Sequence, residues 1–262
     1  MEEIVVPNLD SIVRFSQSAG GDAVYRGLDD VGHSLISRAT VLGFSMKGER
    51  DAIDRFRLYG HGAGLRHQPT SELEWMSLGQ HHGLATRLMD WTHSILVAAY
   101  FAVERAAVVK GKEPPTPTVD AAIYALTAPA GFAPAHRLPQ DVKDDPLGWG
   151  VRYEVVKDPV QVRTVPIPTR FSPSDLTQAL LFIPPVVSAR VSVQSGIFLL
   201  PSRPELPVDK YLADPLVRLR IPAKNTVEVF NALLRCGVHR RALFPDLDGI
   251  ASYANTLCVQ ER

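Results

Sequence analysis

Residues 94–103 read Ser94-Ile95-Leu96-Val97-Ala98-Ala99-Tyr100-Phe101-Ala102-Val103, and this stretch decides the fold. Apolar side chains occupy every side of a helix drawn through it, so the helix must lie in the core of the protein. We expect this helix to run from about Ser94 to Val109. The apolar run from Ile95 to Val103 is too short to cross a bilayer, because a transmembrane helix needs about 20 apolar residues.

Two further helices are predicted on the N-terminal side of this core helix. The segment 47–59 places apolar residues at helical spacing with charged residues between them. Ser71 and Glu74 match a capping box, in which each side chain accepts a hydrogen bond from a free backbone amide of the other residue. The helix that follows should end near Gly83. The N-terminal half is therefore expected to be largely helical.

The C-terminal half is expected to be rich in strands. Eleven of the 21 prolines lie between Pro159 and Pro222, which excludes long helices there because proline lacks the amide donor. A final helix is predicted from about residue 225 to 236. Short apolar or alternating runs predict strands at residues 121–127, 160–167, 190–200 and 216–221. This order of elements indicates an α+β fold, with a helical N-terminal half packed on a β-sheet.

The charge balance excludes a protein covered in one sign of charge. Lys and Arg number 28, Asp and Glu number 28, and the formal net charge is zero. This balance argues against bulk electrostatic capture of nucleic acid. Of the 28 cations 21 are arginine, whose planar guanidinium suits phosphate and carboxylate groups. An anionic ligand and a compositional bias both explain that excess.

The cysteines and the N-terminus bear on location. Cys236 and Cys258 are the only two cysteines, too few for a disulfide scaffold. The start, Met-Glu-Glu-Ile, is acidic and does not match the basic beginning of a signal peptide. We expect a protein of the cytoplasm with no membrane association.

Several common catalytic motifs are absent from the sequence. It contains no G-x-S-x-G nucleophile elbow, no P-loop and no G-x-G-x-x-G dinucleotide turn. It also lacks H-E-x-x-H and C-x-x-C, the usual patterns of zinc ligands. A metal site is not expected.

A dense polar segment, residues 75–94, leads into the core helix. Polar groups that enter an apolar core must be hydrogen-bonded or line a cleft. We therefore interpret the segment as a binding or catalytic site. Its polar and aromatic side chains follow one another closely: Trp75, Gln80, His81, His82, Thr86, Arg87, Asp90, Trp91, Thr92, His93 and Ser94.

A structural role explains part of this segment equally well. Asp90 or Thr92 can cap the start of the core helix, Trp91 can pack, and Arg87 can pair with Asp90. This alternative does not readily account for Gln80, His81 and Thr86.

Two glycine-containing segments are further candidates. The tripeptide Tyr-Arg-Gly at 25–27 reads as the end of a strand, where Gly27 allows a close backbone approach. Arg26 on such a strand would be half-buried and would need an anionic partner, either a ligand or a carboxylate of the fold. Gln194 and Gly196 lie inside a predicted strand, where a glycine marks a bulge or the close approach of a ligand.

At these residues the chain resembles the FRG domain family, which is named for its Phe/Tyr-Arg-Gly start. Residues 80–92, Q-H-H-G-L-A-T-R-L-M-D-W-T, resemble the core pattern of that family, Q-H-[YH]-G-x-x-T-R-L-x-D-W-T. The Tyr-Phe-Ala at 100–102 follows as in the family. Residues 194–198 and 243–251 resemble its later motifs.

The resemblance implies one domain over residues 1–262. Its landmarks span about residues 20–255, nearly the whole chain. The proline-rich segment 111–118 is then expected to be a surface loop.

The resemblance also implies a fold similar to that of the ADP-ribosyltransferases, with a split antiparallel or mixed sheet. In that fold, three positions surround NAD. Arg26 matches the arginine or histidine of the first strand. Thr86, or else Thr92 or Ser94, matches the later serine or threonine, and Gln194 occupies the third position. No glutamate accompanies Gln194, where arginine-modifying transferases keep one, which leaves open a nucleobase, another acceptor or loss of transfer activity.

The same resemblance assigns roles around NAD, which would be a substrate. Arg26 would hold the pyrophosphate by forked hydrogen bonds, and Thr86 would orient the nicotinamide ribose. Asp90 or Gln194 would stabilise the positive charge that develops as nicotinamide leaves. His81 would act as a general base. The residues assigned to NAD binding are Tyr25, Arg26, Gly27, Gln80, Thr86, Arg87 and Thr92.

We therefore expect an NAD-dependent ADP-ribosyltransferase that acts as a bacterial toxin or in phage defence. Its acceptor would be a nucleic acid or a protein, and an antitoxin protein would be its partner.

Two other functions are considered. One is a non-catalytic nucleotide- or RNA-binding module in a toxin–antitoxin or defence system, with basic residues at Arg55, Arg57, Arg66 and His67. These charges are interleaved with acidic ones and also fit a solvated helix face. The other is a hydrolase that uses Asp90 with Asp246 or Asp248, although the stretch 244–248 equally fits a turn and helix cap.

Overall fold

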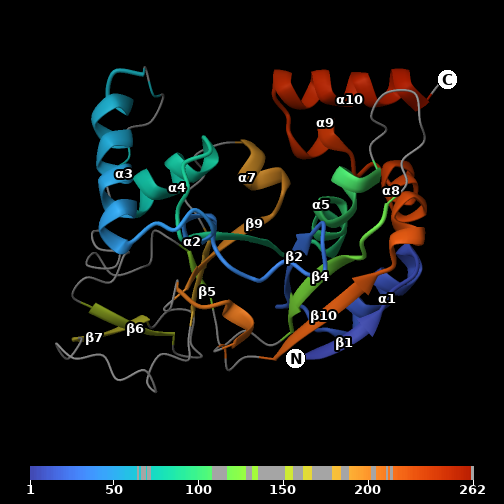
Figure 1. Ribbon diagram of the computed structural model, residues 1–262, viewed down its shortest axis with the longest axis horizontal. Coiled ribbons are helices and arrows are strands. Elements are labelled where there is room, and N and C mark those ends of the chain that lie inside the picture. Colours follow the sequence, from blue (N-terminus) through green and yellow to red (C-terminus); the bar gives the residue numbers. More distant parts are fainter. Residues whose placement is uncertain are drawn as a thin grey trace.

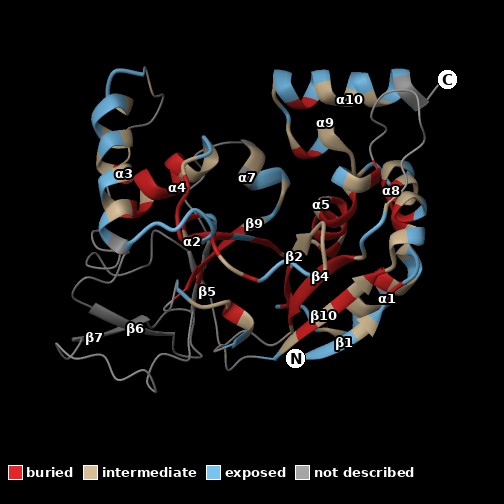
Figure 2. Cartoon of the chain, viewed as in Figure 1, coloured by how far each residue is buried: buried red, intermediate tan, exposed pale blue. Residues whose placement is uncertain are grey.

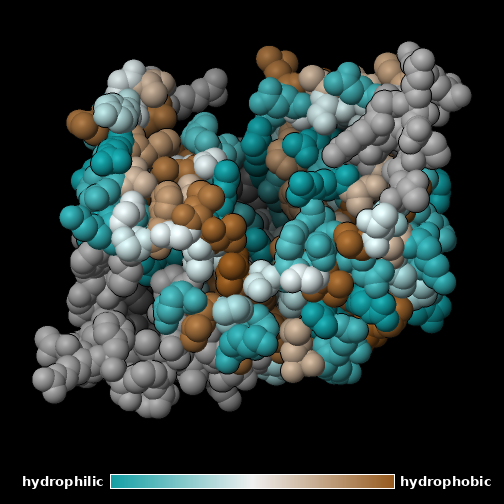
Figure 3. All heavy atoms as spheres, in the orientation of Figure 1, coloured by the Kyte–Doolittle hydropathy of each residue, from teal (hydrophilic) through white to brown (hydrophobic). Residues whose placement is uncertain are grey.

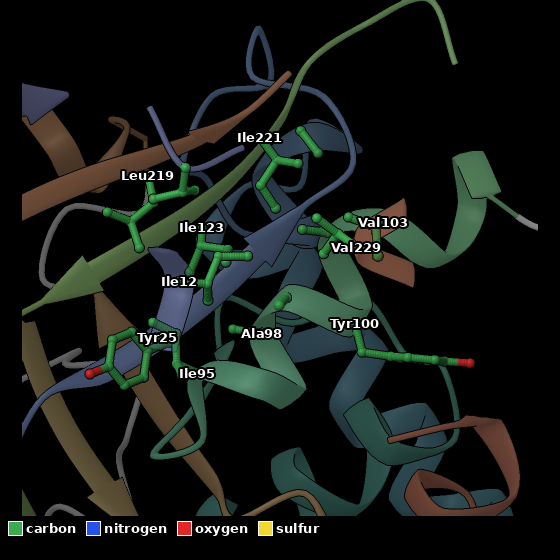
Figure 4. Packing of buried hydrophobic residues seen from close by; sticks show 14 of the residues in the cluster. Ile12, Tyr25, Ile95, Ala98, Tyr100, Val103, Ile123, Leu219, Ile221 and Val229 are labelled. Carbon is green, nitrogen blue, oxygen red and sulfur yellow. The ribbon is translucent and has the colours of Figure 1, made fainter. Parts of the chain in front are cut away.

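The apolar stretch forms the central helix, α5 (Ile95–Ala107), of the computed structural model. Most of its residues are buried, and it packs against three strands and two other helices. Figure 4 shows Ala98 and Val103 of α5 among side chains from those neighbours. The predicted core helix is confirmed, and the end expected at 108–109 lies outside the described residues.

The structure describes most of the chain, although several segments of its middle third are omitted. The described residues are 1–63, 65, 69, 72–107, 117–127, 132–134, 151–155, 162–166, 179–183, 189–201, 205–210, 212 and 215–260. The helices besides α5 are α1 (Leu9–Ser18), α2 (Arg38–Val41), α3 (Met46–Gly60), α4 (Glu72–His81), α7 (Ala189–Val193), α8 (Thr226–Arg235), α9 (Arg240–Leu243) and α10 (Leu247–Gln260). Short 3-10 turns lie at Val208–Lys210 and Ala223–Asn225.

Ten strands are described, and eight of them form one mixed sheet. Their order across the sheet is β1-β10-β4-β2-β3-β9-β8-β5, with parallel pairs only at the two edges, and β6 and β7 form a separate hairpin. The strands are β1 (Glu2–Val5), β2 (Val24–Leu28), β3 (Met89–Thr92), β4 (Ala121–Leu126), β5 (Phe132–Pro134), β6 (Val151–Val155), β7 (Val162–Pro166), β8 (Ala179–Ile183), β9 (Gly196–Pro201) and β10 (Leu216–Ile221). The α+β class is confirmed.

Helices cover one face of the sheet in two separate groups. Helices α1, α5 and α8 pack over β10, β4 and β2, whereas α3 and α4 pack over β9 (Figure 1). On the opposite face, Trp91, Tyr124 and Ile197 form a third cluster with the loop that follows β2. The central strands are therefore buried on both faces, as Figure 2 shows.

Strands β2 and β3 touch at only one register position, although they are neighbours in the sheet. Tyr25 pairs with Thr92, whereas every residue of β2 pairs with β4 and every residue of β3 pairs with β9. A backbone carbonyl at such an opening still needs a hydrogen-bond donor. The Asp90 carbonyl accepts that bond from the Arg26 side chain, with Nη1 at 2.5 Å.

Gly27 lets α5 lie directly on β2. A Cβ atom at this position would be 2.0 Å from the Ala98 carbonyl oxygen and 2.7 Å from the Ala102 amide nitrogen. Both are backbone atoms of α5, so no side-chain rotation could relieve the clash. The close backbone approach expected at Gly27 is confirmed, and its partner is the core helix.

A buried ion pair ties α3 to the segment before β3. The Arg87 Nε donates to a Glu49 carboxylate oxygen at 2.8 Å, and the Arg87 backbone amide donates to the other oxygen at 2.6 Å. The two side chains are 5% and 3% exposed. The proposed pairing of Arg87 with Asp90 is therefore wrong, because Glu49 reaches Arg87 from a helix that is distant in the sequence.

Two sequence expectations need correction. The strand predicted over 190–200 begins as a helix, α7, passes through a turn at Gln194 and Ser195, and becomes β9 only at Gly196. A helix of five residues is too short to reveal its period, and its alternating residues imitate a strand. Besides the expected strand at residues 25–27, which is β2, the N-terminal half also contributes β1 and β3 to the sheet, so it is less helical than expected.

Other expected elements agree with the structure or fall outside it. The predicted helices at 47–59 and 225–236 and the strands at 121–127, 160–167 and 216–221 are confirmed by α3, α8, β4, β7 and β10. Helix α4 ends before Gly83, which has a left-handed φ of 92°. The capping serine, Ser71, and residues 111–116 of the expected surface loop lie outside the described residues. Among the described helices, none combines the length and the apolar character needed to cross a membrane.

We predict that Gly27→Ala strongly destabilises the protein. The added methyl group must push α5 off the sheet, so the loss should reach or exceed the upper end of the roughly 1–3 kcal/mol typical of overpacking. Urea unfolding measures this loss. Gly21→Ala is the matched control, because its Cβ meets nothing within 4 Å. Equal stability of the two variants would contradict the packing described above.

We also predict that Glu49→Gln destabilises the protein by about 3–5 kcal/mol, because it removes the carboxylate charge that is paired with the buried Arg87 guanidinium. Thermal and urea unfolding provide the measurement. In the control, Asp10→Asn, the ion pair with Arg14 is broken at the surface, where both side chains are more than two-thirds exposed. This control should change stability by less than about 1 kcal/mol. If Glu49→Gln loses no more stability than this control, the Arg87–Glu49 pair has no structural role.

Candidate functional site

A cavity of about 480 Å³ opens where β2 and β3 part, and it extends between the two groups of helices. Residues from β2, β3, α4, α5, α7 and β9 line it, together with Phe244 after α9. Its volume lies within the range of about 300–1,000 Å³ that is usual for small-molecule sites. Figure 3 shows a notch in the surface between the side formed by α3 and α4 and the side formed by α9 and α10.

Arg26 brings a positive charge into this cavity. Its Nη1 donates to the Asp90 carbonyl, while its Nε is buried and has no hydrogen-bond partner among the described residues. Burial lowers the pKa of the guanidinium, and the nearby Asp90 carboxylate partly offsets that effect. An arginine nevertheless stays charged at neutral pH. No described carboxylate forms an ion pair with Arg26. The sequence predicted a ligand or a carboxylate of the fold as its partner, and among the described residues the fold supplies only the Asp90 carbonyl.

Asp90 lines the same cavity from the neighbouring strand. Its carboxylate accepts a hydrogen bond from the Gln80 side-chain amide at 2.8 Å. Gln80 in turn accepts a hydrogen bond from the Thr86 hydroxyl. Three of the predicted site residues therefore form one chain, which runs from the protein interior to the cavity wall.

His81 lines the cavity from the end of α4. Partial burial, and then the charges of His82 and Arg190, lower the pKa of its imidazole, against the weaker opposing effects of Asp246 and Asp90. The ring is therefore neutral at pH 7, and a neutral imidazole can accept a proton. It packs edge-on against the ring of His82, with 5.0 Å between ring centres.

Gln194 also reaches the cavity, but from a turn and not from a strand. The side-chain amide of Gln194 donates to the Leu243 carbonyl at 3.0 Å, and the backbone carbonyl of Gln194 accepts from the Thr92 hydroxyl at 2.6 Å. The Thr92 oxygen accepts a further bond from the Ser94 amide at the start of α5. Thr92 therefore anchors the turn, whereas the cap of α5 is Ser94, whose hydroxyl accepts a hydrogen bond from the Val97 amide at 3.4 Å. The cap that the structural alternative placed at Asp90 or Thr92 is wrong.

Some residues assigned to NAD from sequence have internal partners in the fold. Thr86 is 1% exposed and does not line the cavity, and Arg87 is paired with Glu49. Tyr25 and Gly27 line the cavity, but Tyr25 is 3% exposed and Gly27 is in contact with α5. Burial raises the pKa of the Tyr25 hydroxyl. Contact with a ligand is therefore most direct for Arg26, Gln80, His81, Asp90 and Gln194.

The opposite wall was not anticipated from the sequence. Phe101 and Phe244 meet edge-to-face with ring centres 6.0 Å apart, and the guanidinium groups of Arg190 and Arg240 lie 5.1 and 4.3 Å from the centre of the Phe244 ring. Glu104 accepts two hydrogen bonds from Arg240 and a third from the Tyr100 hydroxyl. One feature of the sequence could have indicated this wall. Glu104 and Arg105 follow the Tyr-Phe-Ala of the motif by about one helical turn, so they lie near the same face of the core helix.

Two residues of the other functional hypotheses, Arg57 and Asp246, have partners within the fold. Arg57 forms ion pairs with Asp54 and Glu72, while Arg66 and His67 lie outside the described residues. Asp246 accepts from the Gly249 amide at the start of α10 and pairs with Arg190, and the backbone bond is the main reason why its pKa is lowered. The turn-and-cap interpretation of this stretch is confirmed. Within the described residues, no three His, Cys, Asp or Glu side chains are grouped closely enough to hold a metal ion.

Comparison with known proteins finds a family match for the segment that supplies much of the cavity wall. Residues 21–110 match the family model of the FRG domain, and this range includes β2, α4, β3 and α5. No curated protein and no solved structure matches the chain. The similarity to the ADP-ribosyltransferase fold thus stays a prediction, whereas the match over residues 21–110 confirms the FRG resemblance carried by residues 25–27 and 80–92.

Proposed function

We propose that the cavity binds NAD and that the protein transfers ADP-ribose from it to an acceptor. One observation carries the proposal: the Arg26 guanidinium and the Asp90 carboxylate line the same cavity from adjacent strands. The reaction requires a cation for a phosphate group and an anion for a positively charged transition state. The two groups are present without forming an ion pair with each other.

Arg26 suits the pyrophosphate of NAD. The Arg26 Nη1 donates to a carbonyl and the Nε is buried, which leaves Nη2, with no hydrogen bond to a described residue, as the donor for an anion. Forked hydrogen bonds to phosphate oxygens are charge-assisted and strong. A bound pyrophosphate would also give the Arg26 guanidinium the ion-pair partner that it lacks among the described residues.

Asp90 suits the ribose carbon at which the reaction occurs. The bond between C1′ and the nicotinamide nitrogen breaks, and its electron pair leaves with neutral nicotinamide. A lone pair of the acceptor forms the new bond to C1′. The ribose is positively charged between these events, and a carboxylate held in a partly enclosed cavity stabilises that charge.

His81 suits the acceptor side of the reaction. The acceptor loses a proton as its bond to C1′ forms, and a neutral imidazole lining the cavity can take that proton. Nucleobases and protein side chains both provide such acceptors, and we propose one of these two classes. Consumption of NAD and modification of cellular components would make the protein a toxin or a defence effector, and an antitoxin protein would then restrain it.

The apolar lining suits the flat rings of the dinucleotide. Val97, Phe101, Ile197 and Phe198 lie on the wall beside the charged groups. Aromatic and aliphatic side chains bury the faces of a base, while few polar groups fix its orientation.

We predict that Arg26→Ala weakens NAD binding about 10-fold to 100-fold, because a charge-assisted hydrogen bond contributes about 1.5–3 kcal/mol. Isothermal titration calorimetry measures binding, and labelled NAD with cell lysate measures transfer. Arg26→Lys keeps the charge without the fork and should recover only part of the affinity.

Arg14→Ala is the matched control, because Arg14 lies on the exposed surface of α1. It should bind and consume NAD as the unaltered protein does. Unchanged NAD binding in Arg26→Ala would overturn the proposed site, and so would a lack of label transfer by the unaltered protein.

We predict that the transfer rate falls only at acidic pH, below the ordinary histidine pKa of 6.5, because a base must be unprotonated and the pKa of His81 is lowered. The rate should therefore be level from about pH 7 upwards. His82→Gln removes one charge that lowers this pKa, so the acidic limb should move to higher pH. A pH–rate profile over both proteins provides the measurement. An acidic limb that stays in place in His82→Gln would exclude His81 as its origin.

A further inference from the structure

We propose that Thr86 is a positioning residue, which acts through Gln80 to hold the Asp90 carboxylate in the cavity. The hydrogen bonds from Thr86 through Gln80 to Asp90 are independent of the reaction, whereas their effect on catalysis rests on the proposed function. The sequence resemblance had placed Thr86 against the nicotinamide ribose, and the structure gives it a different part.

The buried Thr86 hydroxyl sets the donor and the acceptor of each hydrogen bond between Thr86, Gln80 and Asp90. The Thr86 oxygen accepts from the Leu88 backbone amide at 3.2 Å, and its single hydrogen is left to donate. Its partner is the carbonyl oxygen of the Gln80 side chain, which can only accept. The Gln80 amide nitrogen must then point the other way, toward Asp90, to which it donates at 2.8 Å.

Burial decreases along the chain toward the cavity. Thr86 is 1% exposed, Gln80 is half-buried and Asp90 is exposed. A ligand can therefore reach Asp90, but it cannot reach the Thr86 hydroxyl. Thr86 is able to influence a bound ligand only through Gln80.

Asp90 is held from two sides, and both contacts come from residues that line the cavity. Arg26 binds its backbone carbonyl, and Gln80 binds one carboxylate oxygen. The other carboxylate oxygen has no hydrogen bond from a described residue. An exposed aspartate with this support has one oxygen directed by the protein and one available to a ligand.

The Thr86 hydroxyl fixes the oxygen end of the Gln80 amide, while the Asp90 carboxylate, which can only accept, binds the nitrogen end. Without the hydroxyl, the buried-side oxygen of the amide has lost its donor, and Gln80 is held at one end only. The Gln80 side chain can then leave its position and take its hydrogen bond away from the Asp90 carboxylate. The carboxylate would move from its place, and a misplacement of about 1 Å can cost a factor of about 100 in rate.

Two substitutions separate this role from simple packing. Thr86→Val keeps the shape of the side chain and removes the hydroxyl, whereas Thr86→Ser keeps the hydroxyl and removes a methyl group. Thr226→Val is the matched control, because Thr226 is fully buried in α8 and its hydroxyl has no partner among the described residues. All comparisons are made well below the melting temperature of each variant.

The first readout does not depend on activity. The side-chain amide of Gln80, assigned by NMR with the help of Gln80→Glu, should change its proton and nitrogen shifts in Thr86→Val and keep them in Thr86→Ser and Thr226→Val. An unchanged Gln80 signal in Thr86→Val would overturn the chain of hydrogen bonds, whether or not the protein consumes NAD.

The second readout is steady-state kinetics with NAD. Thr86→Val should lower kcat about 10-fold to 100-fold, and the dissociation constant for NAD, measured by calorimetry, should change less than about twofold. Thr86→Ser should restore most of kcat. Equal losses in the serine and valine variants would show a packing role and overturn the proposal. A normal kcat in Thr86→Val would also overturn it. An unaltered protein without NAD turnover would refute the proposed function, and the Gln80 signal would still decide the positioning role.

Discussion

One backbone pairing, between Tyr25 and Thr92, joins β2 to β3, and the candidate site exists because the two strands part beyond it. An opening inside a sheet leaves backbone groups without their usual partners, and such groups must find other ones. Here the Arg26 side chain satisfies the Asp90 carbonyl, so the solution to a structural problem also places a guanidinium in the cavity. The helices follow the same division, with α5 on one side of the opening and α4 on the other (Figure 1).

The residues of the family motif divide into those that build this arrangement and those that face the cavity. Gly27 makes room for α5, and Arg87 binds Glu49 on α3. Thr86 and Thr92 make internal hydrogen bonds. The cavity itself receives Arg26, Gln80, His81 and Asp90 from these residues, and Gln194 from the later segment 194–198. A match to the motif therefore indicates mainly a shared fold, because only a minority of its positions are placed to touch a ligand.

Much of the fold could be predicted, because its signals are local. The apolar residues around Ala98 indicated a core helix, and the runs that became β4 and β10 read correctly as strands. The short helix α7 was missed because five residues show no period, and β1 was missed because two of its four residues are glutamates. The site residues near Gln80 stood out by their density of polar groups. The Glu49 partner of Arg87 and the Phe244 wall could not be predicted, since both come from distant segments that only the folded chain brings near.

We propose that NAD occupies the opening between β2 and β3, and a crystal structure of the protein with bound NAD would show whether it does. The pyrophosphate should lie within hydrogen-bond distance of the Arg26 guanidinium, and C1′ of the nicotinamide ribose should lie beside the Asp90 carboxylate. Gln80 should keep its bond to Asp90 in that complex. NAD bound elsewhere on the protein, or an empty cavity at a saturating concentration of NAD, would refute the proposed site.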